Sequence, residues 1–130
     1  MSETRENPYT ADAVALLKQL IATPSVSRDE KAAADILEEA MRGWELHPRR
    51  SGNNLWAVAG DIDPQRPTLL LNAHIDTVRP VASWTRDPFC PMVEGDRLYG
   101  LGSNDCGGGL MALLQVFRLL KATRQAYNLV

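Results

Sequence analysis

The chain has 130 residues, of which 45% are hydrophobic and 23% are charged, and its formal net charge is −2. This composition is typical of one globular domain with a moderate core, and the mixed signs of charge give neither a basic stripe for nucleic acid nor an acidic tail. No apolar run approaches the roughly 20 residues that span a bilayer, and the polar N-terminus lacks the apolar core of a signal peptide, so we expect a cytoplasmic protein with no membrane partner.

The N-terminal third of the chain predicts two helices. Thr10 is a suitable N-cap for a helix over residues 11–22, in which apolar residues recur at helical spacing. Residues 27–30, Ser-Arg-Asp-Glu, have the pattern of a capping box for a second helix, and Gly43 is suited to end that helix. Residues 25–27, Ser-Val-Ser, are therefore interpreted as helix punctuation rather than as a catalytic serine site.

Three strands are expected in the middle of the chain. Residues 45–50 predict a weak edge strand, since Pro48 cannot donate to a strand ladder. Residues 55–59 predict a second strand, and residues 68–72 form an unbroken run, Thr-Leu-Leu-Leu-Asn. Such a run is typical of a strand that is buried on both faces, as in a parallel or mixed sheet covered by helices.

The last part of the chain predicts a hairpin, a helix and the start of another strand. Residues 79–96 are rich in loop formers, and Gly-Asp at 95–96 favours a hairpin turn. Glycines then lead into an apolar helical pattern over residues 109–121, and residues 127–130 have the sequence of a strand. Because a native C-terminus usually lies in a polar surface segment, we expect the chain to be the N-terminal piece of a longer protein.

These elements together indicate an α/β fold with a mixed, mainly parallel sheet. We expect residues 1–9 to form a mobile arm and residues 10–130 to form the N-terminal portion of one domain. A domain interrupted partway through its sheet exposes an unpaired edge and apolar surface, so we also expect the chain to self-associate.

The residues with the clearest chemistry are His74, Asp76 and Asp105. His74 follows the apolar run, at the end of a strand, where open α/β sheets form their sites. Asp76 could accept a hydrogen bond from the imidazole and fix its tautomer. Asp105 lies in a glycine-rich turn before a helix, where a carboxylate can approach a cation closely. Imidazole and carboxylate are ligands of zinc-type hydrolytic sites, so the set indicates a divalent metal centre.

Each of these residues also has a plainer interpretation. His74 could hold a turn by ordinary hydrogen bonds, Asp76 could be a turn residue, and Asp105 could cap the helix that follows it. Three residues also do not complete a site, because a catalytic zinc normally has three protein ligands and a water. On the residues alone, the metal centre and these plainer roles remain alternatives.

Other residues give weaker signals. The glycines at 107–109 match neither of the common nucleotide-binding glycine motifs. Cys106 has no well-placed base and is more simply a small buried residue, and His47 lies in an edge segment where a surface position is expected. Cys90 and Cys106 form no close pair in the sequence, which suits a reducing compartment.

Two segments resemble the signatures of a known enzyme family. Residues 70–78, Leu-Leu-Asn-Ala-His-Ile-Asp-Thr-Val, resemble the first signature of the co-catalytic zinc amidohydrolases. The second signature is matched, in order and spacing, by Trp84, Asp87-Pro88-Phe89, Pro91, residues 95–100, Gly102-Ser103 and Asp105. The family includes acetylornithine deacetylase, succinyl-diaminopimelate desuccinylase, aminoacylase and glutamate carboxypeptidase, and the acetylornithine deacetylase branch is the most similar.

The resemblance implies a role for each candidate residue. His74 would ligate one zinc ion, Asp105 would bridge two zinc ions, and Asp76 would be the catalytic residue that orients His74. Cobalt could substitute for zinc, and the general base and remaining ligands would lie beyond Val130. Gly107 stands where many members have a lysine, a departure that concerns substrate placement or local packing rather than metal binding.

The resemblance also implies a fold and an activity. The fold would be part of a three-layer, zinc-aminopeptidase-like catalytic domain, without the family's lid and dimerisation domain. The full-length protein would be a homodimer that deacylates small N-acyl amino acids in arginine biosynthesis, while this chain alone would be inactive and bind zinc weakly. Two alternatives stay open: a di- or tripeptidase of the same family, and a non-catalytic binding module that keeps the fold.

Overall fold

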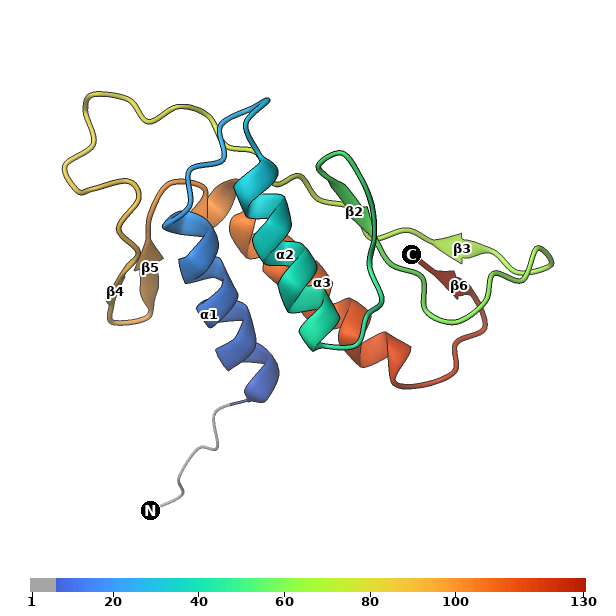
Figure 1. The fold of residues 1–130 in the computed structure, drawn as a ribbon. Helices are drawn as coiled ribbons and strands as arrows, with labels where there is room; N and C mark the ends of the chain where they lie inside the picture. Colours follow the sequence, from blue (N-terminus) through green and yellow to red (C-terminus); the bar gives the residue numbers. More distant parts are fainter. Residues whose placement is uncertain (1–6) are drawn as a thin grey trace, which may run out of the picture.

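The computed structural model describes residues 7–130, which form a mixed α/β fold with the helices side by side and short strands on either side of them (Figure 1). The α/β class expected from the sequence is confirmed. None of the helices in the described residues is long and apolar enough to cross a membrane. In chain order the elements are α1 (Pro8–Ile21), α2 (Lys31–Gly43), β1 (Arg49–Ser51), β2 (Asn54–Trp56), β3 (Thr68–Leu69), β4 (Met92–Glu94), β5 (Arg97–Tyr99), the turn η1 (Ser103–Gly107), α3 (Gly108–Lys121) and β6 (Asn128–Leu129).

Helix α1 begins at Pro8, two residues before the predicted cap. The Asn7 side chain accepts a hydrogen bond from the Tyr9 N–H at 3.0 Å, and Pro8 occupies a first-turn position where its missing N–H has no cost. The prediction that Thr10 caps this helix is therefore wrong, because Asn-Pro is the stronger start signal. Residues 1–6 of the predicted arm lie outside the described residues.

The capping box predicted for α2 does not form. Glu30 occupies the N-cap position of α2 and makes no side-chain bond to the helix end. The Ser27 hydroxyl donates instead to Oδ2 of Asp76. The predicted Ser27 cap is wrong because a hydrogen bond to a charged carboxylate is stronger than one to a neutral backbone N–H.

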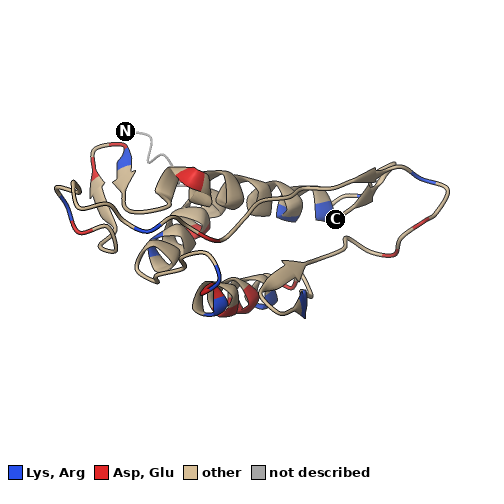
Figure 2. Ribbon diagram, turned by 90° about the horizontal axis from the view of Figure 1, so that it is seen from above, with Lys and Arg blue, Asp and Glu red and all other residues tan. Residues whose placement is uncertain are grey.

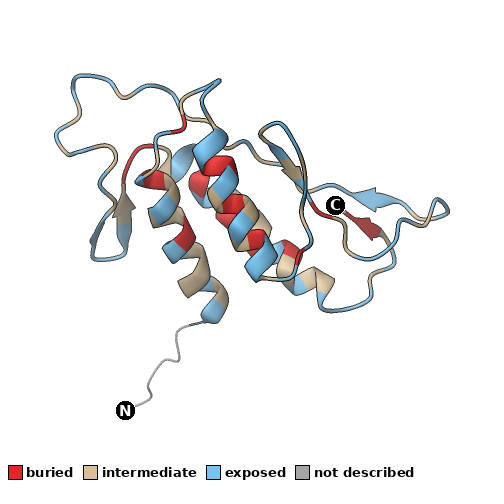
Figure 3. Cartoon of the chain, in the orientation of Figure 1, coloured by how far each residue is buried: buried red, intermediate tan, exposed pale blue. Residues whose placement is uncertain are grey.

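The core lies where the three helices face one another, as the buried residues in Figure 3 show. Leu16 of α1, Leu37 of α2 and Met111 of α3 form one buried cluster. Phe117 of α3 belongs to a second cluster, which joins the helices to the strands. The other buried members of this second cluster are Met41, Leu46, Ala57 and Leu129.

The strands of the described residues form three pairs rather than one ladder. β3 and β6 are parallel, with Leu69 opposite Leu129, while the β1–β2 and β4–β5 pairs are antiparallel. The Ala59 N–H donates to Leu129 O at 3.0 Å, so the chain that leaves β2 runs beside β6. The described strands thus include one parallel pair and two antiparallel pairs.

The apolar run that contains β3 is only partly buried. Leu69 and Leu70 are 39% and 62% exposed. Leu70 and Leu71 line an open groove of about 880 Å³ together with residues of α2, β2 and α3. The prediction of burial on both faces is wrong for the described residues, because only β6 pairs with this run.

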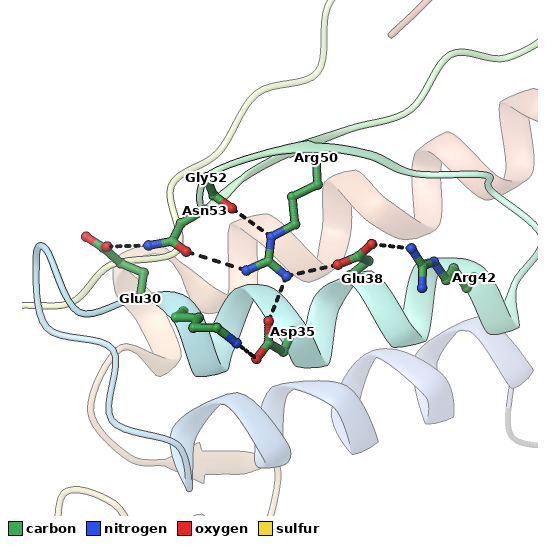
Figure 4. A network of polar contacts seen from close by, with 8 residues as sticks. Glu30, Asp35, Glu38, Arg42, Arg50, Gly52 and Asn53 are labelled. Carbon is green, nitrogen blue, oxygen red and sulfur yellow. Dashed lines mark hydrogen bonds and ion pairs between the residues drawn. The ribbon is translucent and has the colours of Figure 1, made fainter.

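Arg50 ties the β1–β2 hairpin to α2 (Figure 4). Its guanidinium donates to Asp35 at 2.7 Å, to Glu38 at 2.9 Å and to Gly52 O at 2.7 Å. Figure 2 shows positive and negative residues interspersed along α2, where these ion pairs form. Arg50 thus holds the hairpin that forms one wall of the groove.

Replacing Arg50 with lysine tests this link. Lysine keeps the charge but lacks the planar fork, so it cannot reach Asp35, Glu38 and Gly52 O together. We expect Arg50→Lys to lower the midpoint of urea unfolding, measured by circular dichroism. Arg49→Lys, at an exposed position on the same strand, is the matched control; equal midpoints for the two variants would contradict the link.

Candidate metal centre

His74 lies in an extended segment after β3 that is held by the loop between α1 and α2. Thr77 N–H donates to Ser25 O at 2.9 Å, and Ser27 N–H donates to Thr77 O at 3.3 Å. The buried Ser25 side chain also donates to Ile75 O at 3.1 Å. This pairing of two distant parts of the sequence fixes the backbone on the C-terminal side of His74.

Asp105 lies in the turn η1, directly before α3. Gly107 N–H donates to Gly102 O at 2.8 Å, and Gly102 has a φ of 77°, in the left-handed region that favours glycine. The peptide bond between Asp105 and Cys106 is cis. The Cys106 thiol donates to His74 O at 3.1 Å, so the turn is in direct contact with the His74 segment.

The structure brings His74, Asp76 and Asp105 together. Nε2 of His74 lies 3.1 Å from Oδ1 of Asp105. Nδ1 of His74 lies 3.0 Å from the backbone O of Asp76 and 3.3 Å from its Oδ1. The imidazole therefore faces an oxygen acceptor at each nitrogen, and the Asp105 side chain is 84% exposed and open to a ligand.

These contacts shift the pKa values of two groups. The hydrogen bond to the backbone carbonyl of Asp76 raises the pKa of His74, partial burial opposes this, and the Asp105 carboxylate adds to the rise. The hydrogen bond from Ser27 is the main cause that lowers the pKa of Asp76. A neutral imidazole has one N–H and satisfies only one of its two acceptors. An imidazolium, or a cation between Nε2 and Asp105, satisfies both.

The two donor atoms fit one divalent cation. Zinc binds imidazole nitrogen and carboxylate oxygen at about 2.0–2.2 Å, so two ligand atoms in a tetrahedral shell lie about 3.3 Å apart. The separation between Nε2 of His74 and Oδ1 of Asp105 is 3.1 Å. In residues 7–130 no group of three or more His, Cys, Asp and Glu side chains is placed to hold a metal, so the described residues supply a partial ligand set.

The plainer interpretations of these residues can be compared with their contacts. Asp105 does not cap α3, because Gly107 occupies the N-cap position and no side chain bonds to that helix end. His47 is exposed, as expected for a surface residue, and Cys106 is only half-buried. Ser27 is the residue that the sequence interpretation missed, because its local pattern matched a capping box and gave no signal of a contact with Asp76.

The model of peptidase family M20/M25/M40 matches residues 70–130, the part of the chain that holds His74, Asp76 and Asp105. The chain belongs to this family. The family predicted from the two signatures is thereby confirmed.

Similar proteins in this family are much longer than the chain. The succinyl-diaminopimelate desuccinylase of Variovorax paradoxus (strain S110) is 37% identical over 122 residues, which cover 83% of this chain and 31% of that protein. The enzyme of the same name from Caulobacter sp. (strain K31) is 32% identical over 121 residues, which cover 88% of this chain and 30% of that protein. The chain therefore spans about three tenths of the length of the curated relatives it matches.

A solved structure shows the same fold. Human carnosine dipeptidase 1 matches with a TM-score of 0.63 and 20% sequence identity, over 94% of this chain and 31% of that chain. At this identity the likeness concerns the fold alone. It supports the α/β arrangement of helices and strands described above.

This chain has Gly107 where the family resemblance leads one to expect lysine, and local packing explains the glycine. A Cβ at this position would lie 2.5 Å from Gly102 O and 2.6 Å from Cδ1 of Leu17. The turn that presents Asp105 therefore packs against α1 without space for a side chain. A lysine would require η1 and α1 to pack differently.

Alanine substitutions at two neighbouring glycines test this packing. Gly107→Ala overpacks the turn against backbone, and we expect it to lower the free energy of unfolding by about 1–3 kcal/mol. Gly109→Ala is the matched control, because a Cβ there meets nothing within 4 Å, and its better helix propensity should stabilise the chain by about 0.5–1 kcal/mol. Urea unfolding measures both; a Gly107→Ala variant as stable as Gly109→Ala would refute the close approach.

The raised pKa of His74 predicts how the stability of the metal-free chain depends on pH. Because the fold favours the imidazolium, its contribution is complete below the unfolded pKa of about 6.5 and is lost as pH rises through the higher folded pKa. We expect the stability advantage of the wild type over His74→Gln, from urea unfolding with a chelator present, to fall as pH rises across this window. This pH-dependent fall should be smaller when both proteins also carry Asp105→Asn. A stability advantage of the wild type over His74→Gln that does not change with pH would contradict the two-acceptor geometry.

Proposed function

We propose that this chain forms part of a zinc-dependent hydrolase that deacylates N-acyl amino acids. The observation that carries the proposal is the 3.1 Å separation between Nε2 of His74 and Oδ1 of Asp105. Membership of family M20/M25/M40 supports hydrolysis. The names of the relatives, succinyl-diaminopimelate desuccinylases, support an N-acyl amino acid as the substrate class.

In this proposal His74 and Asp105 hold zinc and Asp76 orients the imidazole. Asp76 accepts from Nδ1 of His74, which keeps the ring proton away from Nε2. The exposed Asp105 carboxylate has a second oxygen with which it can bridge to a second zinc ion. Zinc, when bound, supplies Lewis acidity to a substrate carbonyl, and cobalt accepts the same donors. The general base and remaining ligands would come from other parts of the whole protein.

The acyl group of the substrate is the finer part of the proposal. The signatures most resemble acetylornithine deacetylases, which favours an N-acetyl substrate on the route to arginine, whereas the matched relatives are named for an N-succinyl substrate. Both substrates are amides between a short acyl group and an amino acid, so the same carbonyl chemistry serves both. Assays of the whole protein with acetylornithine, acetylcitrulline, N-succinyl-diaminopimelate and dipeptides would separate these substrates from a peptidase.

The proposal extends to the assembly of the protein. Residues 10–130 would form one portion of the catalytic domain of a cytoplasmic enzyme that is a homodimer when complete. Within the chain, the exposed Leu69 and Leu70 offer an apolar surface to a second copy.

Zinc binding by the chain tests the two proposed ligands. We expect weak binding in calorimetry, because only two protein ligands are supplied, and no deacylase activity from the chain alone. His74→Ala and Asp105→Ala should each raise the dissociation constant at least about tenfold, equivalent to about 1.4 kcal/mol. His47→Ala and Asp96→Ala are matched controls away from the site. Tight stoichiometric binding, or binding that none of these variants weakens, would refute the ligand assignment.

Self-association can be tested by light scattering of the chain after it has been purified by chromatography. We expect an average mass above that of the monomer, rising with concentration, because Leu70 is 62% exposed and, among the described residues, no strand pairs with the edge of the apolar run that faces away from β6. Leu70→Glu should shift the average mass toward the monomer, while Ile62→Glu, at a loop position that is 50% exposed, should not. A wild type that stays monomeric at high concentration would contradict this surface.

A further inference from the structure

Ser27 connects the loop between α1 and α2 to the candidate metal centre. Its hydroxyl donates to Oδ2 of Asp76, and the other carboxylate oxygen, Oδ1, lies 3.3 Å from Nδ1 of His74. Nε2 of His74 in turn lies 3.1 Å from Asp105. The four side chains form one continuous polar chain that ends at the exposed Asp105 carboxylate.

The backbone around Ser27 is fixed independently of its hydroxyl. Ser27 N–H donates to Thr77 O at 3.3 Å, and Thr77 N–H donates to Ser25 O at 2.9 Å. The hydroxyl takes no part in capping α2, because Glu30 occupies the N-cap position. Removal of the hydroxyl leaves these backbone bonds in place, so its effect on Asp76 can be measured separately from the fold of the loop.

The Ser27 hydroxyl restricts how the Asp76 carboxylate can turn. The terminal torsion angle of an aspartate side chain can take a broad range of values. A hydrogen bond from Ser27 to Oδ2 narrows this range and leaves Oδ1 facing Nδ1 of His74. An acceptor at Nδ1 places the imidazole proton there and leaves the lone pair of Nε2 directed toward Asp105. The backbone O of Asp76, at 3.0 Å from Nδ1, also accepts the ring proton and does not depend on Ser27, so the hydroxyl acts on the orientation of the imidazole through the Asp76 carboxylate.

We propose that Ser27 is a positioning residue of the metal centre, which acts through Asp76 to orient His74 as a ligand. The inference rests on the proposed function, since ligand orientation matters only where His74 binds a cation. It differs from a purely structural role, in which Ser27 would stabilise the loop and leave the imidazole unchanged.

The test compares Ser27→Ala with Ser51→Ala, which removes an exposed serine hydroxyl at the end of β1. The ring ¹H–¹³C signals of the metal-free chain are recorded at one alkaline pH, with His47→Gln used for assignment and the His47 ring as internal reference. We expect Ser27→Ala to shift or broaden the His74 signals and leave the His47 signals in place. Ser51→Ala should leave both rings unchanged.

Zinc affinity provides a second measurement on the same variants. Loss of a side chain that supports a metal ligand by hydrogen bonding typically weakens metal binding by 10–100-fold. We expect Ser27→Ala to raise the zinc dissociation constant by about tenfold, at the lower end of this range. Ser51→Ala should bind zinc like the wild type. A Ser27→Ala chain with wild-type ring signals and wild-type zinc affinity would overturn the inference.

A further pair of variants keeps the test decisive if alanine disturbs the loop. Ser27→Thr retains the hydroxyl, while Ser27→Val has nearly the shape of threonine without it. We expect the threonine variant to keep the wild-type His74 signals and the valine variant to change them. In an Asp76→Ala background, Ser27→Ala should have no further effect on His74. Equal His74 signals in the threonine and valine variants, or an undiminished effect without Asp76, would overturn the inference.

Failure of the Ser27 inference can be distinguished from failure of the proposed function. Zinc binding that does not need His74 would overturn the proposed function, and with it the role of Ser27 in a metal centre. Unchanged ring signals and unchanged zinc affinity in Ser27→Ala, alongside zinc binding that needs His74, would overturn the Ser27 inference alone.

Discussion

The candidate metal centre is built around one imidazole placed between two oxygen acceptors. His74 faces Asp76 through Nδ1 and Asp105 through Nε2, at 3.0 Å from the Asp76 carbonyl and 3.1 Å from the Asp105 carboxylate. A neutral ring can donate to only one of them. The arrangement is satisfied by a second proton or by a cation, and the same geometry therefore explains both the raised pKa of His74 and its fitness as a metal ligand.

The fold produces this geometry by bringing together parts of the chain that are far apart in sequence. The loop that follows α1 pairs with the backbone after His74, and a glycine turn brings Asp105 against the same segment. Because Gly107 lies against Leu17 of α1, helix packing and ligand placement are coupled. The open groove between β2 and the apolar run lies next to this site, and His74 contributes to its lining.

The sequence predicts the site better than it predicts the local contacts. His74 and Asp105 could be identified because His74 follows an apolar run, Asp105 precedes an apolar helix and both belong to family signatures. A signature does not reveal which hydrogen bonds surround these residues. Thr10 was the predicted cap of α1, but the helix begins at Pro8 and the Asn7 side chain accepts from the Tyr9 N–H, a start that the apolar spacing did not reveal. Ser27 satisfied a local capping pattern but bonds to a charged acceptor far away in sequence. The exposure of Leu70 depends on which strands pair with it, and a single apolar run does not carry that information.

Anomalous diffraction at the zinc edge, from crystals soaked in zinc, tests whether His74 and Asp105 bind one divalent cation. We expect a peak within bonding distance of both Nε2 of His74 and an Asp105 carboxylate oxygen, with Asp76 still at Nδ1. Zinc bound elsewhere, at His47 or Cys90 for example, with no peak beside His74, would contradict it.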